Sequence, residues 1–425
     1  MYSELNMRTL YVLASYFLMP FLLLHLAVRG LRDSDWLRRW GERFALYRQP
    51  IPPGGIIVHA ASIGEVNAAT PLIRALRVRF PELTLTVTCF TPTGSERIRT
   101  LFPTDVHHVY LPLDLWGAVR RFLSHLRPRL LVVMETELWP NLFFAARQYR
   151  IPVLLVNARI SDTSFSAYQR LRPLLKATLK AVSRIAAQSE VDARRLEKLG
   201  APADRIEVTG NLKFDLSLPT GLHEQGQALR RSWGEHRQVI VGGSTHEGDE
   251  APLIEAFTGV QRQFAGAMLV LVPRHPERFQ NAARLARAAG LTVQLRSEST
   301  HYPPSVECVV VDAMGELLPC YAACDIAFVG GSLAPVGGHN LLEPAALSVP
   351  LLVGPHTQNS ADVTEQLLAA GAALVVKDAV ELEQAAVRLL GDADLRRNMG
   401  AAGKALVYRG QGALERTLNI LAGLL

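Results

Sequence analysis

The sequence predicts an α/β protein with two doubly wound domains, each a parallel sheet covered by helices on both faces. Short apolar runs typical of buried strands alternate with helix-length segments along most of the chain, which is the pattern of βαβ units. The alternation occurs twice, on either side of a polar stretch, and 425 residues exceed the usual size of one hydrophobic core. We therefore expect two Rossmann-like domains that face a cleft at the carboxyl ends of their strands.

The composition narrows the range of functions. Apolar residues make up 49% and charged residues 20% of the chain, so the protein is globular and not disordered. The net charge of +6 suits an acidic partner, either an anionic membrane or a phosphorylated substrate. No nucleic-acid motif is recognised, so nucleic acid is not an expected partner. The cysteines form no CxxC pair and are expected to be reduced core thiols, not zinc ligands: Cys89, Cys308, Cys320 and Cys324.

Residues 1–48 are expected to form a membrane anchor followed by a basic interfacial segment. The run from Leu10 to Val28 is the most hydrophobic stretch of the chain, and its length is close to the minimum that crosses a bilayer. Arginines are frequent just after this run, whereas Arg8 alone precedes it, which places the bulk of the chain in the cytoplasm. A cleaved signal peptide is disfavoured because no small-residue cleavage site follows. A helix that lies in the membrane interface is the main alternative.

The first domain, residues 49–216, carries a candidate catalytic carboxylate. Its first strand ends in HAASIGEVN, so Glu65 lies near a helix start and next to the expected cleft. A carboxylate there can act as a general base, and the helix dipole would favour its ionised form. It could equally be an ordinary helix-terminal charge, and His59 is expected to be a hydrogen-bonded core residue. The strands expected in this domain are Ile56–Ala61, Leu83–Phe90, Val106–Leu111, Leu130–Met134, Val153–Val156 and Ile185–Ala187.

Two further segments of this domain bear charges beside predicted strand ends. Glu135 and Glu137 follow the fourth strand in METELWPN, where charge next to a core is costly without a purpose. They could cap the next helix, position an acceptor or orient the base. In TGNLKFD, Lys213 is either a cation for a carboxylate or phosphate, or a surface lysine.

A polar stretch at 217–236 is expected to be the linker to the second domain, residues 237–425. The last stretch, 401–425, reads as one amphipathic helix that could pack back on the first domain. The strands expected in the second domain are Val239–Val241, Met268–Val272, Leu291–Leu295, Cys308–Val311, Ile326–Val329, Pro350–Val353 and Ala373–Val376.

Four loops of the second domain follow strands and are expected to converge on one sheet edge, as a nucleotide site requires. They are 242–248, 273–279, 313–317 and the glycine-rich 330–341. The last loop leads into a helix expected from Asn340, the geometry that binds anions. It matches neither GxGxxG nor a Walker motif, so neither a dinucleotide nor a P-loop is indicated. Glu343 could accept hydrogen bonds from a ribose, although a tight turn that needs glycine for packing is the simpler alternative.

Together these segments resemble the Kdo (3-deoxy-D-manno-octulosonic acid) transferases of lipopolysaccharide synthesis. The resemblance covers essentially the whole chain, and several long motifs in order are far more specific than any one of them. They are HAASIGE at 59–65, METELWPN at 134–141, TGNLKFD at 209–215, GGSTHEGDE at 242–250, PRHPERF at 273–279 and GGSLAPVGGHNLLEPA at 330–345.

The resemblance implies a GT-B glycosyltransferase with an N-terminal acceptor domain and a C-terminal donor domain. It implies transfer of Kdo from CMP-Kdo to lipid IVA, the lipid A precursor, with inversion and without a metal or other cofactor. It also implies an inner-membrane location with the catalytic domains on the cytoplasmic side. The number of Kdo units transferred is not settled by these motifs.

The resemblance also implies residue roles. Glu65 matches the catalytic base, and Lys213 is the candidate for the Kdo carboxylate. Support of the acceptor or of the transition state is expected from Ser62, Gly64, Glu135 and Glu137. Donor binding is expected from Lys213, Ser244, Thr245, His246, Arg274, His275, Pro276, Met314, Gly315, Glu316, Gly338, His339, Asn340 and Glu343.

Two other functions remain open at this point. One is a different membrane-associated GT-B transferase that uses a UDP-sugar. The other is a membrane-tethered, two-lobed sugar-binding or scaffold protein, in which the cleft closes without chemistry.

Overall fold

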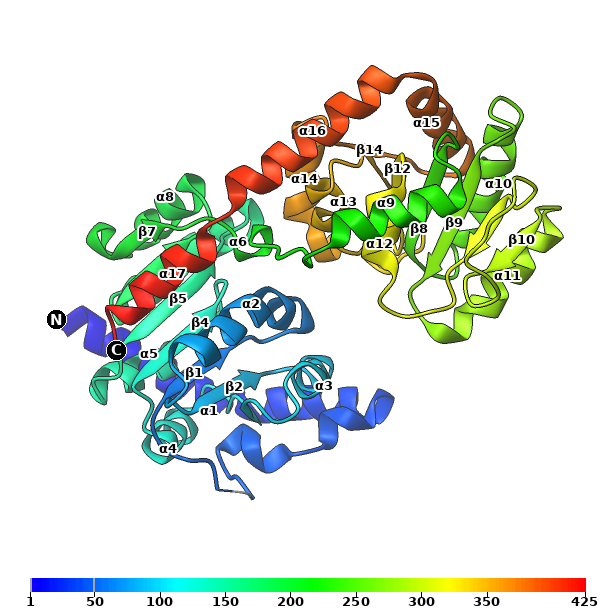
Figure 1. Cartoon of the computed structure of the whole chain (residues 1–425). Coiled ribbons are helices and arrows are strands. Elements are labelled where there is room, and N and C mark those ends of the chain that lie inside the picture. The colour runs from blue at the N-terminus through cyan, green and yellow to red at the C-terminus, as the bar shows by residue number, and fades with distance from the viewer. Residues whose placement is uncertain (1, 49) are drawn as a thin grey trace. The chain divides into compact units, whose positions relative to one another are not determined.

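The computed structural model describes residues 2–48 and 50–425, with side chains described from Met7 onward except at position 49. The chain forms two compact units, Met1–Asp215 with Gln411–Leu425, and Leu216–Gly410. Each unit contains a parallel seven-stranded sheet between helices (Figure 1). The predicted α/β class with two doubly wound domains is therefore confirmed.

The sheet of the first unit has the strand order β3-β2-β1-β4-β5-β6-β7, and every pair is parallel. Its central strands are buried on both faces, which is why they read as unbroken apolar runs. The strand β7 was not expected from the sequence, since its three residues are all half-buried. The strands are β1 (Ile56–His59), β2 (Leu85–Cys89), β3 (His107–Tyr110), β4 (Leu130–Met134), β5 (Val153–Ala158), β6 (Arg184–Ala187) and β7 (Ile206–Val208).

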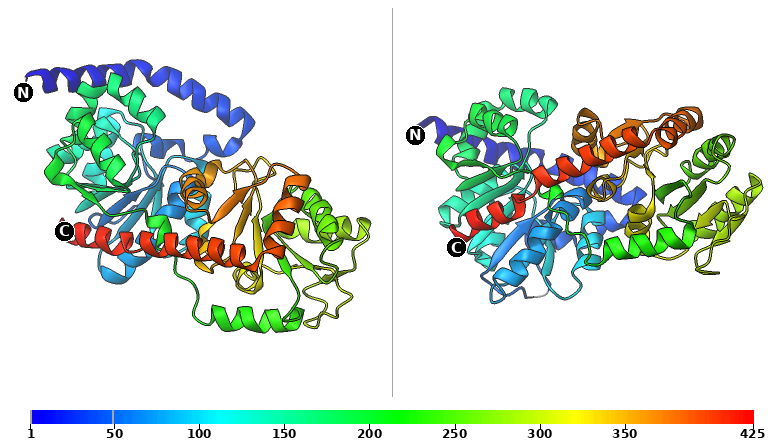
Figure 2. Two further views of the ribbon diagram at one scale, coloured as in Figure 1. Left: turned by 90° about the horizontal axis from the view of Figure 1, so that it is seen from above. Right: turned by 45° about the horizontal axis from the view of Figure 1, so that its top comes forward.

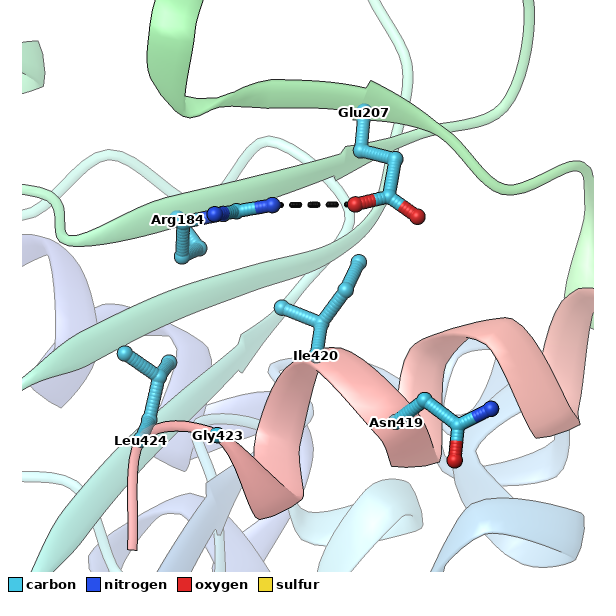
Figure 3. A pocket seen from close by; sticks show the side chains of 6 residues that line it. All are labelled: Arg184, Glu207, Asn419, Ile420, Gly423 and Leu424. Atoms are coloured by element: carbon cyan, nitrogen blue, oxygen red, sulfur yellow. Dashed lines mark hydrogen bonds and ion pairs between the residues drawn. The ribbon is translucent and has the colours of Figure 1, made fainter.

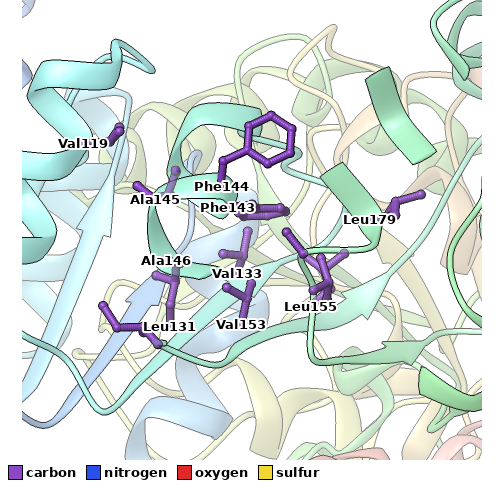
Figure 4. Close-up of a cluster of buried hydrophobic side chains, with 14 of the residues drawn as sticks. Val119, Leu131, Val133, Phe143, Phe144, Ala145, Ala146, Val153, Leu155 and Leu179 are labelled. Carbon is purple, nitrogen blue, oxygen red and sulfur yellow. The ribbon is translucent and has the colours of Figure 1, made fainter. Parts of the chain in front are cut away.

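Helices cover both faces of this sheet. One core lies between the sheet and α4, α5, α7 and α8; part of it appears in Figure 4, where Phe143 of α5 lies above Val133 and Leu155 of the strands. The other core joins the sheet to α2, α3 and the C-terminal helix α17 (Ala413–Ala422). The helices are α2 (Ile63–Arg79), α3 (Pro92–Leu101), α4 (Trp116–Leu126), α5 (Pro140–Gln148), α6 (Asp162–Arg170), α7 (Arg172–Leu179) and α8 (Glu190–Leu199), with 3-10 turns η3 (Ala203–Arg205) and η4 (Leu212–Phe214).

The end of the chain corrects one expectation. The single helix expected at 401–425 is two helices, α16 (Ala393–Gly410) and α17 (Ala413–Ala422). Gly412 between them has φ 90°, a left-handed conformation that stops a helix and that glycine adopts at little cost. The chain passes here from the second unit back to the first, so α17 packs on the first unit's sheet.

The sheet of the second unit has the order β10-β11-β9-β8-β12-β13-β14 and is also parallel. Its strands are β8 (Val239–Thr245), β9 (Met268–Pro273), β10 (Val293–Leu295), β11 (Cys308–Val310), β12 (Ile326–Val329), β13 (Leu351–Val353) and β14 (Ala373–Val375). Besides α16, its helices include α10 (Glu250–Gln261), α11 (Phe279–Ala288), α12 (Leu317–Ala323), α13 (Leu342–Ala346), α14 (Ala361–Ala369) and α15 (Ala379–Gly391), with 3-10 turns η5 (Pro276–Arg278) and η6 (Gln358–Ser360).

The expected linker at 217–236 is largely a helix, which is a second correction. Residues Leu222–Trp233 form α9, which packs against α12 of the second unit. Gly226 lies so close to Ala322 that a Cβ would be 2.6 Å from its methyl group. The buried large apolar residues of α9 are Leu222 and Trp233, at its two ends. They are too few to show a helical hydrophobic period in the sequence.

The N-terminal helix α1 (Tyr2–Arg32) is longer than the expected hydrophobic run. The part from Met7 to Arg32 is the one helix among the described residues that is long and apolar enough to cross a membrane. Two 3-10 turns follow it, η1 (Ser34–Leu37) and η2 (Trp40–Phe44). In Figure 2 it runs along the first unit, where it contacts α5 and α7.

Candidate functional site

Acidic side chains gather at the carboxyl edge of the first unit's sheet. The neighbouring strands β1 and β4 run in register from Ile56 beside Leu130, so the loops after them begin side by side. Glu65 follows β1, and Glu135 and Glu137 follow β4. Both carboxylates raise the pKa of Glu65 by repulsion, and such repulsion acts over a short range. The structure therefore brings Glu65 together with two acids that lie 70 or more positions after it in the sequence.

Glu65 is held in a fixed position at the start of α2. One of its carboxylate oxygens accepts a hydrogen bond from the Ala61 amide at 2.9 Å, and the other accepts one from the Ser62 hydroxyl at 2.9 Å. Ser62 is the N-cap and in turn accepts from the Glu65 amide at 3.4 Å. This arrangement resembles a capping box, so Glu65 does stabilise the helix start; only 8% of the residue is exposed.

The pKa of Glu65 corrects the expectation that its helix position keeps it ionised. Burial, together with the nearby carboxylate of Glu137, raises the pKa of Glu65 to about 8 against the lowering effect of the Ala61 amide. Desolvation disfavours the charged form more than a helix terminus favours it. A carboxylate with a pKa near neutrality is well matched to general-base work.

Aromatic side chains form one wall of this acidic cluster. The Trp139 indole donates to the Glu137 carboxylate at 3.0 Å, and burial raises the pKa of Glu137 as well. The Trp139 ring lies 5.8 Å from Phe90 and 6.0 Å from His59. His59 is fully buried with Nδ1 3.0 Å from the Thr88 hydroxyl, and burial lowers its pKa to about 3. It is the neutral core histidine that the sequence predicts.

The backbone at Glu135 and the position of Lys213 complete this unit's predicted residues. Glu135 has φ 53°, a conformation that costs a non-glycine residue energy and is often found at functional sites. Gly64 is the second residue of α2 and is exposed. Lys213 lies half-buried in η4, which packs on α2, the helix that carries Glu65.

In the second unit, the four predicted loops do meet at one edge of the sheet. They follow β11, β9, β8 and β12, which are consecutive neighbours in the parallel sheet. Their carboxyl ends therefore lie side by side, as the sequence predicts.

Three histidines from three of these loops form a cluster in which two rings are stacked. The rings of His246 and His339 are parallel with centroids 5.0 Å apart, and their Nε2 atoms are 2.7 Å apart. His275 lies edge-on to His246 at 5.2 Å. Burial, together with the neighbouring His246 and Arg274, lowers the pKa of His339 to about 4. Burial lowers the pKa of His246 as well. The N–H groups of this cluster could donate to a phosphate.

Asn340 and Glu343 are placed differently from the expectation. The helix expected from Asn340 begins at Leu342 and is only five residues long, so its dipole is weak. Asn340 instead turns the chain, accepting from the Leu342 amide at 3.0 Å and donating to the Glu343 carboxylate at 3.0 Å. Burial raises the pKa of Glu343.

The remaining predicted donor residues vary in their surroundings. Thr245 is buried and donates to Glu250 at 3.3 Å, and Ser244 before it has φ 54°. Glu316 accepts from Arg296 at 2.9 Å, so its carboxylate is engaged within the protein. The others lie on the loops, with Met314 and Pro276 exposed and Gly315 and Gly338 at positive φ.

Asp249 is a buried site residue that sequence reasoning missed. Its carboxylate accepts hydrogen bonds from four amides: His246 at 2.9 Å, Gly331 at 2.7 Å, Leu333 at 3.1 Å and Ala334 at 2.9 Å. It thereby ties the loop after β8 to the loop after β12. Its position at the N-cap of α10 was the available signal, but its side chain bonds to another loop and not to its own helix.

Glycine is required where these two loops touch. A Cβ on Gly330 would lie 2.5 Å from the Ser244 carbonyl oxygen, a contact that backbone atoms cannot relieve. Gly331 has φ 68°, and its amide is one of the donors to Asp249. The glycine pair thus allows the close approach that the sequence pattern indicates.

A buried ion pair stabilises the same edge of the second unit's sheet. Arg278 bonds to the Glu250 carboxylate and, at 2.8 Å, to Glu247. Glu250 is fully buried, and burial raises its pKa while Arg278 lowers it. Neither residue was singled out from the sequence.

A pocket of about 340 Å³ in the first unit lies elsewhere. It lies between α17 and the strands β6 and β7 (Figure 3), near Arg184, the first residue of β6. Arg184 bonds to Glu207 at 2.9 Å across its wall. Strand starts lie at the sheet edge opposite to the acidic cluster, so this pocket contributes nothing to the candidate site.

Comparison with known proteins adds an independent finding. A family model described as "3-Deoxy-D-manno-octulosonic-acid transferase (kdotransferase)" matches residues 38–216. A 3-deoxy-D-manno-octulosonic acid transferase of Haemophilus influenzae is 38% identical over 95% of this chain and 95% of its own length. One of Bordetella pertussis is 39% identical over 93% of this chain and 97% of its own. A solved glycosyltransferase of Rickettsia africae has a similar fold, with TM-score 0.53, 14% identity, and coverage of 89% and 99% of the two chains.

Proposed function

Since this chain belongs to the Kdo (3-deoxy-D-manno-octulosonic acid) transferases, glycosyltransferases of lipopolysaccharide synthesis with a GT-B fold, we propose that it transfers Kdo from CMP-Kdo to lipid IVA. The proposal adds inversion at the anomeric carbon and independence from a catalytic metal. It also places the enzyme at the inner membrane with its two α/β units in the cytoplasm. The observation that carries the chemistry is the buried Glu65, held by two hydrogen bonds beside two further acids.

In the proposed reaction, the carboxylate of Glu65 takes the proton of a lipid hydroxyl. The hydroxyl oxygen forms a bond to C2 of Kdo while the bond from C2 to the phosphate oxygen breaks, and CMP leaves with that electron pair. The attack from the opposite face inverts the configuration. Glu135 and Glu137 position the acceptor, and the proton leaves Glu65 after the step.

The second unit is proposed to bind the donor. Arg274 and the N–H groups of His246 and His339 meet the negative charge that grows on the departing phosphate, since donors aimed at developing charge are a large catalytic term. Glu343, oriented by Asn340 at 3.0 Å, receives the ribose hydroxyls. Lys213 pairs with the Kdo carboxylate.

The test is product mass from purified protein given lipid IVA and CMP-Kdo, with and without EDTA. We expect a lipid heavier by one or more Kdo units in both samples. Glu65→Gln should reduce the rate by roughly 10²–10⁴-fold with circular dichroism unchanged, whereas Glu96→Gln, at an exposed site on α3, should be neutral.

Other outcomes would overturn particular parts of the proposal. Loss of product with EDTA, restored by added metal, would remove metal independence. Product from UDP-sugars but not from CMP-Kdo would replace the donor. Full activity of Glu65→Gln would remove the base, and a β-configured donor yielding a β-linked product by NMR would remove inversion.

A further inference from the structure

The helix α1 has two different faces, and the inner one is attached to the folded unit along its length. Half-buried or buried positions recur every three or four residues, and the large residues Leu10, Leu13 and Phe17 between them are exposed. The inward positions are Arg8, Tyr11, Val12, Ser15, Met19, Leu23, Leu26 and Gly30. This spacing keeps one stripe of the helix against the protein for about 33 Å.

Polar contacts fix the first half of this stripe. The Tyr11 hydroxyl donates to Asp114 at 2.9 Å, and the Asn141 amide group donates to the Ser15 hydroxyl at 3.4 Å. The Gly117 amide donates to the Tyr16 hydroxyl at 3.0 Å. A helix surrounded by lipid would leave these hydroxyl groups without the partners they have here, and burying unpaired polar groups in hydrocarbon is unfavourable.

Apolar packing fixes the second half. Leu26 is 1% exposed and belongs to a core cluster with Leu113, Leu115 and Ala118, against which Met19 and Leu23 also pack. At the end of the helix, a Cβ on Gly30 would lie 2.4 Å from the side chain of Leu37, so η1 is closely packed there. The docked stretch is as long as the hydrocarbon core of a bilayer is thick, about 30 Å, and cannot both span and stay docked.

The outer face is mostly apolar, with His25 as a polar exposed residue within it. Its side chains are 47–85% exposed at Leu10, Leu13, Phe17, Leu18, Phe21, Leu24, Val28 and Leu31. A continuous row of this size is rare on a surface that faces only water.

Basic and aromatic residues border this face at both ends. The Arg8 guanidinium lies 4.2 Å from the Trp116 ring, and the Arg29 guanidinium lies 4.7 Å from the Trp36 ring. The exposed basic residues nearby are Arg32, Arg38 and Arg120, and the acidic residues there are Asp33 and Asp35. This net positive border complements anionic lipid headgroups, and tryptophan is favoured at the same depth.

We infer that α1 does not span the membrane but lies in its plane, with the outer face inserted into one leaflet of anionic lipid and the inner face docked on the first unit. Insertion to about 5–10 Å below the headgroups is expected of such a helix.

The docked helix is connected to the acidic cluster through side-chain contacts. Phe90 packs against the same cluster as Leu26, its ring is 5.8 Å from Trp139, and Trp139 donates to Glu137. If the proposed function holds, a lipid acceptor could present its sugar to Glu65 while its acyl chains stay in the leaflet. The orientation of α1 itself stands without that function.

The test measures the depth of spin labels on single cysteines at Leu10, Phe17, Leu24 and Leu31, in vesicles of phosphatidylethanolamine and phosphatidylglycerol. These positions are seven residues apart and share the outer face. Cys324→Ser removes the one native cysteine that is not buried. A label at the inward Met19 is the matched control.

An in-plane helix places all four labels at one shallow depth and leaves Met19→Cys out of contact with lipid. A spanning helix instead gives depths that change by about 10 Å from one label to the next, which would overturn the inference. If a second copy of the chain covers the face instead, the labels would be shielded from both oxygen and water, and their spectra would be broadened by coupling between labels. That result would also overturn the inference. Because no turnover is measured, failure here is separate from failure of the proposed function.

Discussion

At the scale of single residues, burial decides the chemistry more than local sequence does. Glu65 occupies a helix start that favours its charge, yet its pKa is raised to about 8 by desolvation and by Glu137. His59 shows the same effect with the opposite sign, since burial lowers its pKa to about 3. Neither shift can be estimated from neighbours in the sequence.

The raised pKa of Glu65 predicts the pH dependence of the reaction. The proposed base acts as a carboxylate, so kcat/KM should rise with pH and level off above about 8. Removing the repulsion with Glu137→Gln should move this inflection to lower pH. The measurement is a pH–rate profile of both proteins, and an inflection near the ordinary value for glutamate in the wild type would contradict the assignment.

Asp249 should support donor binding without touching the reaction. Asp249→Ala leaves four amides without their acceptor, so we expect a loss of about 2–4 kcal/mol in unfolding free energy and a larger fall in donor affinity than in kcat. Urea unfolding and donor titration would measure both effects. Asp394→Ala, at an exposed site, is the control; an unchanged donor affinity in Asp249→Ala would exclude the positioning role.

At the scale of elements, local contacts hold together segments that are far apart in the chain. Asp215 accepts from the amides of Gly412 and Leu414, both at 2.6 Å, and so caps the start of α17. Arg416 of α17 donates to the Thr209 carbonyl at 2.8 Å. Asp215 is the last residue before the chain enters the second unit, and Gly412 and Leu414 come just after the chain returns to the first unit.

Removing the cap should therefore weaken the attachment of α17. Asp215→Ala should lower the unfolding free energy of the first unit by about 1–2 kcal/mol and speed amide exchange in residues 413–422. Hydrogen exchange followed by mass spectrometry would locate the effect. Glu415→Ala, which breaks only the exposed ion pair with Arg79, should change little; equal effects of the two variants would contradict the cap.

At the scale of the whole molecule, the two units differ in how they use the chain. The second unit is continuous, from Leu216 to Gly410, whereas the first needs the C-terminal segment. Within α17, Leu418 and Leu421 are buried in the core that the first sheet shares with α2.

This difference predicts which fragment folds alone. Residues 216–410 should give a cooperative thermal transition when expressed alone. Residues 1–215 should not, because the apolar surface that α17 covers would be exposed, and added peptide 411–425 should restore the transition. Calorimetry would measure both; a stable 1–215 fragment without the peptide would show that α17 is dispensable.

The sequence by itself determined the fold class, nearly all strands, the loops of the second unit and the family. These follow from local patterns, since buried parallel strands are apolar throughout and catalytic loops follow strand ends. It missed β7 and α9, whose apolar surface is too small to impose a period, and it joined α16 and α17 across Gly412. The cleft that the two domains are expected to share stays a prediction.

Only the tertiary structure decided which groups meet. The meeting of Glu65 with Glu135 and Glu137, the hold of Asp249 on the glycine loop, and the docking of α1 all join residues far apart in the chain. Such contacts depend on the order of strands in the sheet and on which distant residues pack against a given side chain. Desolvation and hydrogen bonding across space have no counterpart in sequence spacing, which is why the sequence proposed the site residues and the fold set their chemistry.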